Sequence, residues 1–156
     1  MNLKERWGVL TEVKTAPVPK LTPELMIKIN AVYEKLSSRK GFPTNYCGPA
    51  MQELRRLGFQ GIRGFFQVGR SGDLDLLLDH SHDWAEDAGG KIIDLTAAQY
   101  NREKSLGAVI PSGVLIIDKE NPLYERYIIL ERLPTRPLFP TPKDVFSKWK
   151  VVLLGG

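Results

Sequence analysis

An α+β domain is the fold class that this sequence predicts, with helices early in the chain and an antiparallel sheet after them. Apolar residues recur at helical spacing up to about residue 57, whereas the residues at every second position from Leu74 to Trp84 share one face of a half-buried strand. Turn sequences rich in Gly, Pro, Asn and Asp then separate further short segments. Helices followed by a run of strands are typical of α+β domains.

A single domain is expected over residues 1–156, because a chain of this length with 42% apolar residues can build one core. Residues 1–23 are interpreted as an N-terminal extension and a proline-rich linker, since residues 15–23 include three prolines. Residues 24–133 form the predicted core, and residues 134–156 form a proline-rich C-terminal segment.

Two helices are predicted before the sheet. The first follows Thr22, which can cap it, and Pro23, which suits a first helical position. Its buried stripe is predicted to contain Leu25, Ile29, Val32 and Leu36. The second helix is expected to start near Cys47 and to stop at Gly58.

The strands are predicted from alternation and from the turns between them. Their expected ranges are 64–68, the alternating run that ends at Trp84, 91–96, 113–117 and 124–130. The turn residues 87–90 join the second and third strands into a hairpin. Asn121 and Pro122 mark the turn between the last two.

Composition excludes several classes of protein. Lys and Arg exceed Asp and Glu by only 22 to 18 and are spread along the chain, so no nucleic-acid partner is expected. Neither a membrane-spanning stretch nor the apolar run of a secretory signal is found, so we expect no membrane association and a cytoplasmic location. One cysteine allows neither an internal disulfide nor a multi-cysteine zinc cluster, and we expect no cofactor.

Cys47 is the candidate nucleophile because it lies at the predicted start of a helix. The positive end of a helix dipole and a nearby imidazolium together can lower a thiol pKa from ~8.5 to roughly 3.5–7.5. The turn at Gly48 and Pro49 leaves backbone N–H groups near the sulfur, where they can hold an oxyanion. The alternative is an inert, buried cysteine.

The hairpin supplies the candidate base. A turn centred on Ala88 pairs His82 with Asp94 on one face of the sheet, at the spacing that lets a carboxylate orient an imidazole. Trp84 then lies opposite Ile92 and shields the imidazole from water. A register shift of one residue would place Asp94 opposite Asp83 instead.

Three fragments resemble a known superfamily. His82-Asp83-Trp84-Ala85-Glu86 is similar to the H-x-W-x-E strand of transglutaminase-like folds, and residues 92–96 resemble the aspartate strand that follows it there. Residues 45–50, Asn-Tyr-Cys-Gly-Pro-Ala, resemble the start of the central helix in papain-like enzymes and papain-fold toxins. The order Cys, His, Asp is that of the superfamily.

The resemblance implies a small papain-like or transglutaminase-like fold and a thiol-dependent amide hydrolase, either a cysteine peptidase or a glutamine deamidase, acting on a protein or peptide. Transglutaminase and acyltransferase branches of the superfamily also exist. It implies Cys47 as nucleophile, His82 as base and Asp94 as the residue that orients it. Papain-like enzymes place an oxyanion-binding glutamine before the cysteine, and this chain has none there, so Asn45, Gly48 and Trp84 are the candidate supporting residues. For Gln99 we expect a structural hydrogen bond.

Two other interpretations stay open. His80 and His82, with Asp79 or Asp83, have the alternate spacing of some metal sites, although the chain has only two histidines. In the other interpretation the protein is not an enzyme but a catalytically silent interaction domain, which contacts its partner through Arg55 and Arg56. The sequence predicts no oligomeric state.

Overall fold

The computed structural model describes residues 17–69, 80–103 and 106–135. All of them belong to one structural unit, Pro17–Thr135. Its helices are α2 (Pro23–Ser37) and α3 (Cys47–Arg56), and its short 3-10 helices are η1 (Ala97–Arg102) and η3 (Tyr124–Arg126). Its strands are β1 (Gln60–Phe66), β2 (Ser81–Glu86), β3 (Ile92–Asp94), β4 (Leu115–Ile117) and β5 (Tyr127–Arg132).

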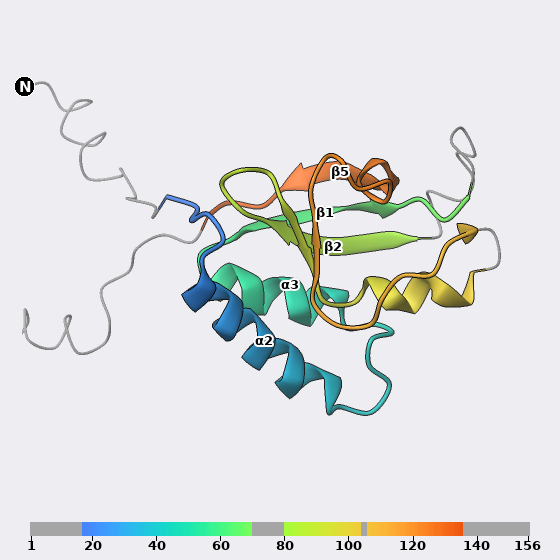
Figure 1. Cartoon of the computed structure of the whole chain (residues 1–156), viewed down its shortest axis with the longest axis horizontal. Coiled ribbons are helices and arrows are strands. Elements are labelled where there is room, and N and C mark those ends of the chain that lie inside the picture. Colours follow the sequence, from blue (N-terminus) through green and yellow to red (C-terminus); the bar gives the residue numbers. More distant parts are fainter. Residues whose placement is uncertain (1–16, 70–79, 104–105, 136–156) are drawn as a thin grey trace, which may run out of the picture. The chain divides into compact units, whose positions relative to one another are not determined.

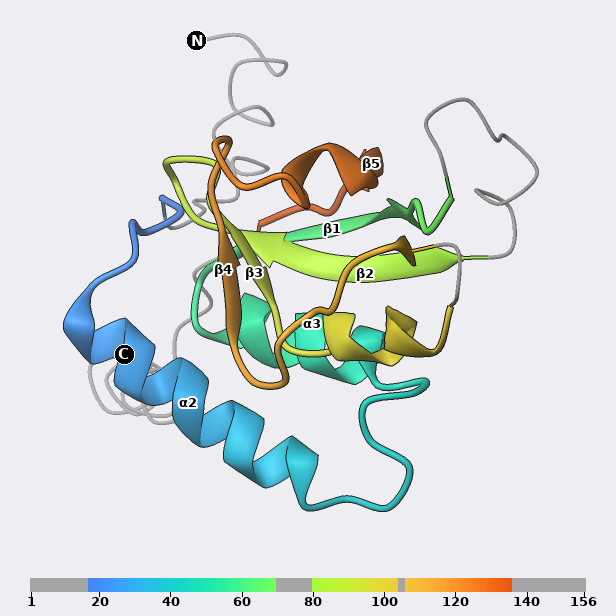
Figure 2. The same cartoon turned by 45° about the vertical axis from the view of Figure 1, so that its right-hand side comes forward.

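The five strands form one antiparallel sheet in the order β4-β3-β2-β1-β5. Both views place α2 and α3 on the same side of this sheet, with η1 beside the N-terminal end of α3 (Figures 1 and 2). The α+β class and the packing of two helices on an antiparallel sheet are therefore confirmed.

The predicted signals at the ends of the two helices are confirmed. The hydroxyl of Thr22 accepts a hydrogen bond from the N–H of Leu25 at 3.2 Å, a cap that contributes about 1 kcal/mol to helix stability. Past the end of α3, Gly58 has a φ of +102°, a left-handed conformation that suits glycine, and its N–H donates to the carbonyl of Arg55.

Two apolar clusters use alternate residues of the central strands. Ile93 and Ala85 pack with the buried faces of α2 and α3. Ile92 and Trp84 pack in the other cluster, with η1 and β5. His82 has the same parity as Trp84, so this second cluster is the one that surrounds the histidine.

The predicted register of the β2–β3 hairpin is wrong by two residues. Glu86 opposes Ile92 and Ala85 opposes Ile93, so the turn is centred on Gly89 and not on Ala88. The reason is the Asp87 carboxylate, which accepts the N–H groups of Gly89 and Lys91 at 2.9 Å each. These bonds, with the Asp87–Lys91 backbone bond, leave three residues in the loop.

Several strand boundaries also differ from the prediction. β1 begins at Gln60, four residues before the expected range, because residues 60–63 already pair with Asp83–Glu86 of β2. Residues 124–126 form η3, so β5 begins only at Tyr127. β3 and β4 are shorter than the expected 91–96 and 113–117. The predicted alternation at 74–79 and the segment 136–156 lie outside the described residues.

No helix in the described part of the chain combines the length and the apolar character needed to cross a membrane.

Candidate functional site

Cys47 is the first residue of α3 and is half-buried. The backbone hydrogen bonds of this helix begin at Ala50, whose N–H donates to the carbonyl of Tyr46 at 2.9 Å. Pro49 has no N–H, and among the described residues the N–H groups of Cys47 and Gly48 have no acceptor. Two donors at the positive end of a helix dipole thus remain available next to the sulfur.

His82 lies on β2 with its side chain fully buried. Its Nε2 is 2.6 Å from Oδ2 of Asp94. The other ring nitrogen, Nδ1, is buried and makes no hydrogen bond of normal geometry with the described residues. The thiol of Cys47 nevertheless interacts electrostatically with this ring, and the pKa of each group depends on the other.

Asp94, at the end of β3, is a buried carboxylate whose two oxygens are both engaged. Oδ2 accepts from the Tyr127 hydroxyl at 2.8 Å in addition to its contact with His82. Oδ1 accepts from the backbone N–H of Thr96 at 2.9 Å and from the Thr96 hydroxyl at 3.3 Å. These bonds fix the carboxylate in position and favour its ionised form.

Aromatic rings enclose the imidazole of His82. Trp84 stacks on it at a centroid distance of 5.9 Å, and Tyr100 meets it edge-on at 5.2 Å. Phe66 and Tyr127 each lie 6.2 Å away. The ring is thus held in a water-poor pocket, where its interaction with Asp94 is stronger than it would be in water.

The electrostatics of the site favour a charged pair. Burial by itself disfavours charge on His82, but the Asp94 carboxylate, and after it the Cys47 thiol, together outweigh this effect and raise the pKa of His82 to about 9. Burial raises the pKa of Cys47, whereas the His82 ring and the backbone N–H of Asp83 lower it, and the net pKa is below its ordinary value. The pKa of Asp94 is also lowered despite burial, by His82, Thr96 and Tyr127. The shifts of His82 and Cys47 favour an imidazolium and a thiolate, and the shift of Asp94 favours the carboxylate that pairs with the imidazolium.

The structure places the three predicted supporting residues, Gly48, Trp84 and Asn45, at different distances from the proposed chemistry: the first two adjoin Cys47 or His82, and the third lies in a turn. Gly48 follows Cys47 in α3 and carries one of the two free N–H groups. Trp84 stacks on His82, as expected, but is not opposite Ile92. Asn45 is exposed, has a φ of +66° and makes no side-chain hydrogen bond to the described residues, so it acts as a turn residue beside the helix.

Among the described residues, no side-chain hydrogen bond of Gln99 is found. Gln99 belongs to η1, and its Nε2 is buried without a hydrogen-bond partner among the described residues. His80 is half-buried, with its ring 6.0 Å from that of Tyr100. In the described part of the chain, which leaves out Asp79, no group of three metal-ligating side chains is placed to hold a metal ion.

The sequence did not reveal three residues that contact the His82–Asp94 pair. Tyr127 and Thr96 donate hydrogen bonds to Asp94, and Tyr100 packs against the His82 ring. Tyr127 lies in a predicted strand, but its contact with Asp94 spans 33 residues of sequence and depends on the strand order. Thr96 had a local signal, because a residue two positions after an aspartate commonly donates its N–H to that carboxylate.

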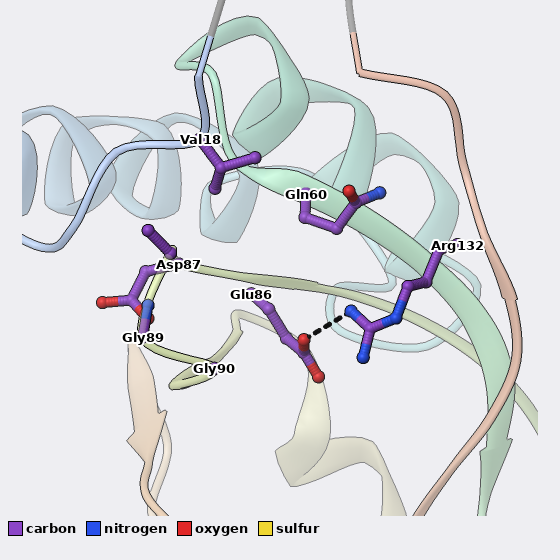
Figure 3. Close-up of a pocket in the computed structure, with 8 residues that line it drawn as sticks. Val18, Gln60, Glu86, Asp87, Gly89, Gly90 and Arg132 are labelled. Atoms are coloured by element: carbon purple, nitrogen blue, oxygen red, sulfur yellow. Dashed lines mark hydrogen bonds and ion pairs between the residues drawn. The ribbon is translucent and has the colours of Figure 1, made fainter.

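A separate cavity of about 510 Å³ lies at the other end of β2. It is lined by the turn 87–90, Val18, Gln60 and the ion pair between Glu86 and Arg132, whose atoms are 2.8 Å apart (Figure 3). None of the three predicted catalytic residues lines it. The site at Cys47 is therefore a surface position at a helix end and not this hollow.

Comparison with known proteins adds no relative: no family model, no curated protein and no solved structure matches the chain.

Proposed function

We propose that this protein is a thiol-dependent amide hydrolase, a cysteine peptidase or a glutamine deamidase, with a papain-like or transglutaminase-like fold. The observation that carries the proposal is the buried His82–Asp94 pair, 2.6 Å apart, beside a thiol at a helix N-terminus. An imidazole that is oriented by a carboxylate and coupled to a thiol is the arrangement that activates a cysteine nucleophile.

The proposed reaction begins with the Cys47 thiolate, which attacks the carbonyl carbon of an amide. The oxygen of the resulting tetrahedral intermediate accepts hydrogen bonds from the N–H groups of Cys47 and Gly48, which have no other acceptor among the described residues. His82 then donates its proton to the leaving nitrogen, and the amine departs. Water, deprotonated by His82, attacks the thioester and releases the acid and the free thiol.

The Cys47 thiol and the His82 ring interact through a side-chain hydrogen bond and through charge, although Nδ1 has no partner of normal geometry among the described residues. Catalytic hydrogen bonds are often long in free enzymes and shorten when the substrate binds. The buried, unpartnered Nδ1 supports this reading, because a polar atom in an apolar pocket needs a partner.

Incubation with candidate substrates followed by intact-mass measurement tests the proposal. Deamidation produces the small mass gain of amide-to-acid conversion, whereas proteolysis splits the substrate chain. Cys47→Ala should remove either signal and leave the unfolding transition almost unchanged, because the thiol is half-buried and small. Retention of full activity by the alanine variant would show that another group is the nucleophile.

The second candidate is a silent interaction domain that binds through Arg55 and Arg56. The structure gives these side chains internal partners. Arg55 donates to Gln52 and to the carbonyl of Pro134, and Arg56 pairs with Glu53. These internal contacts compete with a partner for the two side chains, and in such a domain the buried His82–Asp94 pair would serve only to stabilise the fold.

A further inference from the structure

Asp83 places a carboxylate beside the thiol on the side away from the His82 ring. The two residues are neighbours on β2, so their side chains point to opposite faces of the sheet. A Cβ atom added to Gly48 would lie 3.6 Å from Oδ2 of Asp83, so the carboxylate lies against the first turn of α3. Its negative charge acts on Cys47 and opposes formation of the thiolate.

The charge of Asp83 is partly compensated by Arg63 on β1 and by the His82 ring. Nε of Arg63 lies 3.8 Å from Oδ1 of Asp83, and the Arg63 side chain is 53% exposed. An ion pair this long and this exposed contributes little. The Asp83 side chain itself is 20% exposed, which leaves the carboxylate reachable from the surface next to Cys47.

A carboxylate at this position has a chemical consequence for substrates. During attack by Cys47, negative charge develops on the oxygen held at the N-terminus of α3, and the charge of Asp83 repels it. A positive charge on the substrate that meets Asp83 cancels this repulsion and adds an attractive contact. An acidic substrate group meets repulsion both in binding and in the transition state.

We infer that Asp83 is a specificity residue that selects protein or peptide segments with a Lys or Arg side chain next to the amide that Cys47 attacks. This inference rests on the proposed function, because it assigns a substrate class to the same site. Arg63 weakens the preference, since it competes with the substrate cation for the carboxylate of Asp83.

Because Cys47 is the only cysteine in the chain, its rates of reaction with charged thiol reagents report the electrostatic potential around its sulfur. Two methanethiosulfonate reagents, one with a trimethylammonium group and one with a sulfonate group, each form a mixed disulfide with Cys47 and release a sulfinate. The ratio of their rate constants reports the charge around the sulfur. Changes in the reactivity of the thiol itself act on both reagents alike and cancel in this ratio.

Asp83→Asn should lower the cation-to-anion ratio by about fivefold, and high salt should shrink the difference. Arg63→Gln should raise the ratio. The matched control is Arg132→Gln, which removes an arginine of equal exposure (54%) that pairs with a carboxylate at the far end of β2 and should leave the ratio unchanged. An unchanged ratio in Asp83→Asn, or equal shifts in Arg63→Gln and Arg132→Gln, would overturn the inference.

Peptidyl vinyl sulfones with Lys or Glu beside the electrophile test the substrate class. The Lys probe should label wild-type Cys47 faster than the Glu probe, and Asp83→Asn should bring the two rates together. Equal labelling of the wild type by both probes overturns the assignment. Failure of the proposed function looks different, because Cys47 would then react no faster than the thiol of the unfolded chain with any reagent.

Discussion

Asp94 reaches His82 diagonally across the β2–β3 pair, with Oδ2 2.6 Å from Nε2, although the ladder itself pairs Ile93 with Ala85. Diagonal neighbours on one face of a sheet lie within reach of long side chains. The β3 strand ends at Asp94, where the bonds from Thr96 turn the chain away from the ladder. The contact therefore depends on the end of a strand as much as on its register.

Asp94→Asn preserves the shape of this contact and removes its charge. We expect the pKa of His82 to fall from about 9, because the carboxylate is what raises it against the effect of burial. An NMR titration of the imidazole measures this, and His80→Ala identifies the signal because the chain has only two histidines. A His82 pKa that is the same in Asp94→Asn and wild type would show that the pair is not electrostatically coupled in solution.

The sign of the pH effect on stability follows from the same pair. A histidine whose pKa is raised on folding stabilises the protein fully below the unfolded value of 6.5, and this contribution is lost as the pH rises through about 9. The free energy of unfolding should thus decline over that interval in wild type and less in Asp94→Asn. Urea unfolding at several pH values measures it, and parallel curves would speak against the coupling.

Tyr127→Phe removes the hydroxyl that donates to Asp94 and keeps the ring packed against Phe66 and Trp84. Loss of a hydrogen bond to a charged, buried acceptor should reduce the free energy of unfolding by about 1.5–3 kcal/mol. Tyr124→Phe is the matched control, because the Tyr124 hydroxyl makes no hydrogen bond to the described residues. Equal stability losses in both variants would mean that the Asp94 contact contributes nothing.

Gly64→Ala should destabilise the protein strongly because β1 and β5 approach closely there. The added Cβ would lie 1.9 Å from the carbonyl oxygen of Ile128 and 2.7 Å from the Trp84 ring. Strain from such overpacking typically costs about 1–3 kcal/mol or more. Gly89→Ala, where the nearest atom is 3.4 Å away, is the control, and thermal unfolding compares the two. Equal transition temperatures would contradict this packing.

The two histidines should differ in their effect on the thiol. His82→Ala removes the side chain that lowers the Cys47 pKa, so alkylation near neutral pH should slow markedly. His80→Ala should leave the rate close to that of wild type, because His80 is not among the groups that shift the Cys47 pKa. Equal losses from both variants, together with bound zinc in the purified protein, would favour the metal-site interpretation.

Local signals were sufficient to predict much of the helical part of the fold. Thr22 and Pro23 indicated the start of α2 and Gly58 the end of α3, and Pro49, which suits a first helical turn, indicated a helix start near Cys47. The side-chain parity of His82 and Asp94 was also predictable, because an error of two residues in register keeps both on the same face.

What the sequence could not predict depends on contacts between distant segments. The loop geometry at Asp87 comes from side-chain bonds that also tie Leu21, 66 residues away, to the turn. Tyr127 reaches Asp94 only because β5 pairs with β1. In the sequence, Asp83 stood out only as a register alternative and a possible metal ligand, and its place against Gly48 follows from the approach of α3 to β2.

The pH dependence of Cys47 alkylation tests the central claim most directly. With iodoacetamide as a neutral reagent and one cysteine in the chain, the rate reports the thiolate fraction of Cys47. A thiol paired with the His82 imidazolium should give a profile whose apparent pKa lies below that of an ordinary thiol, about 8.5, and moves up in His82→Ala. A wild-type profile with an apparent pKa of about 8.5 or above, unchanged in His82→Ala, would show that Cys47 is an ordinary, half-buried thiol and not a nucleophile activated by His82.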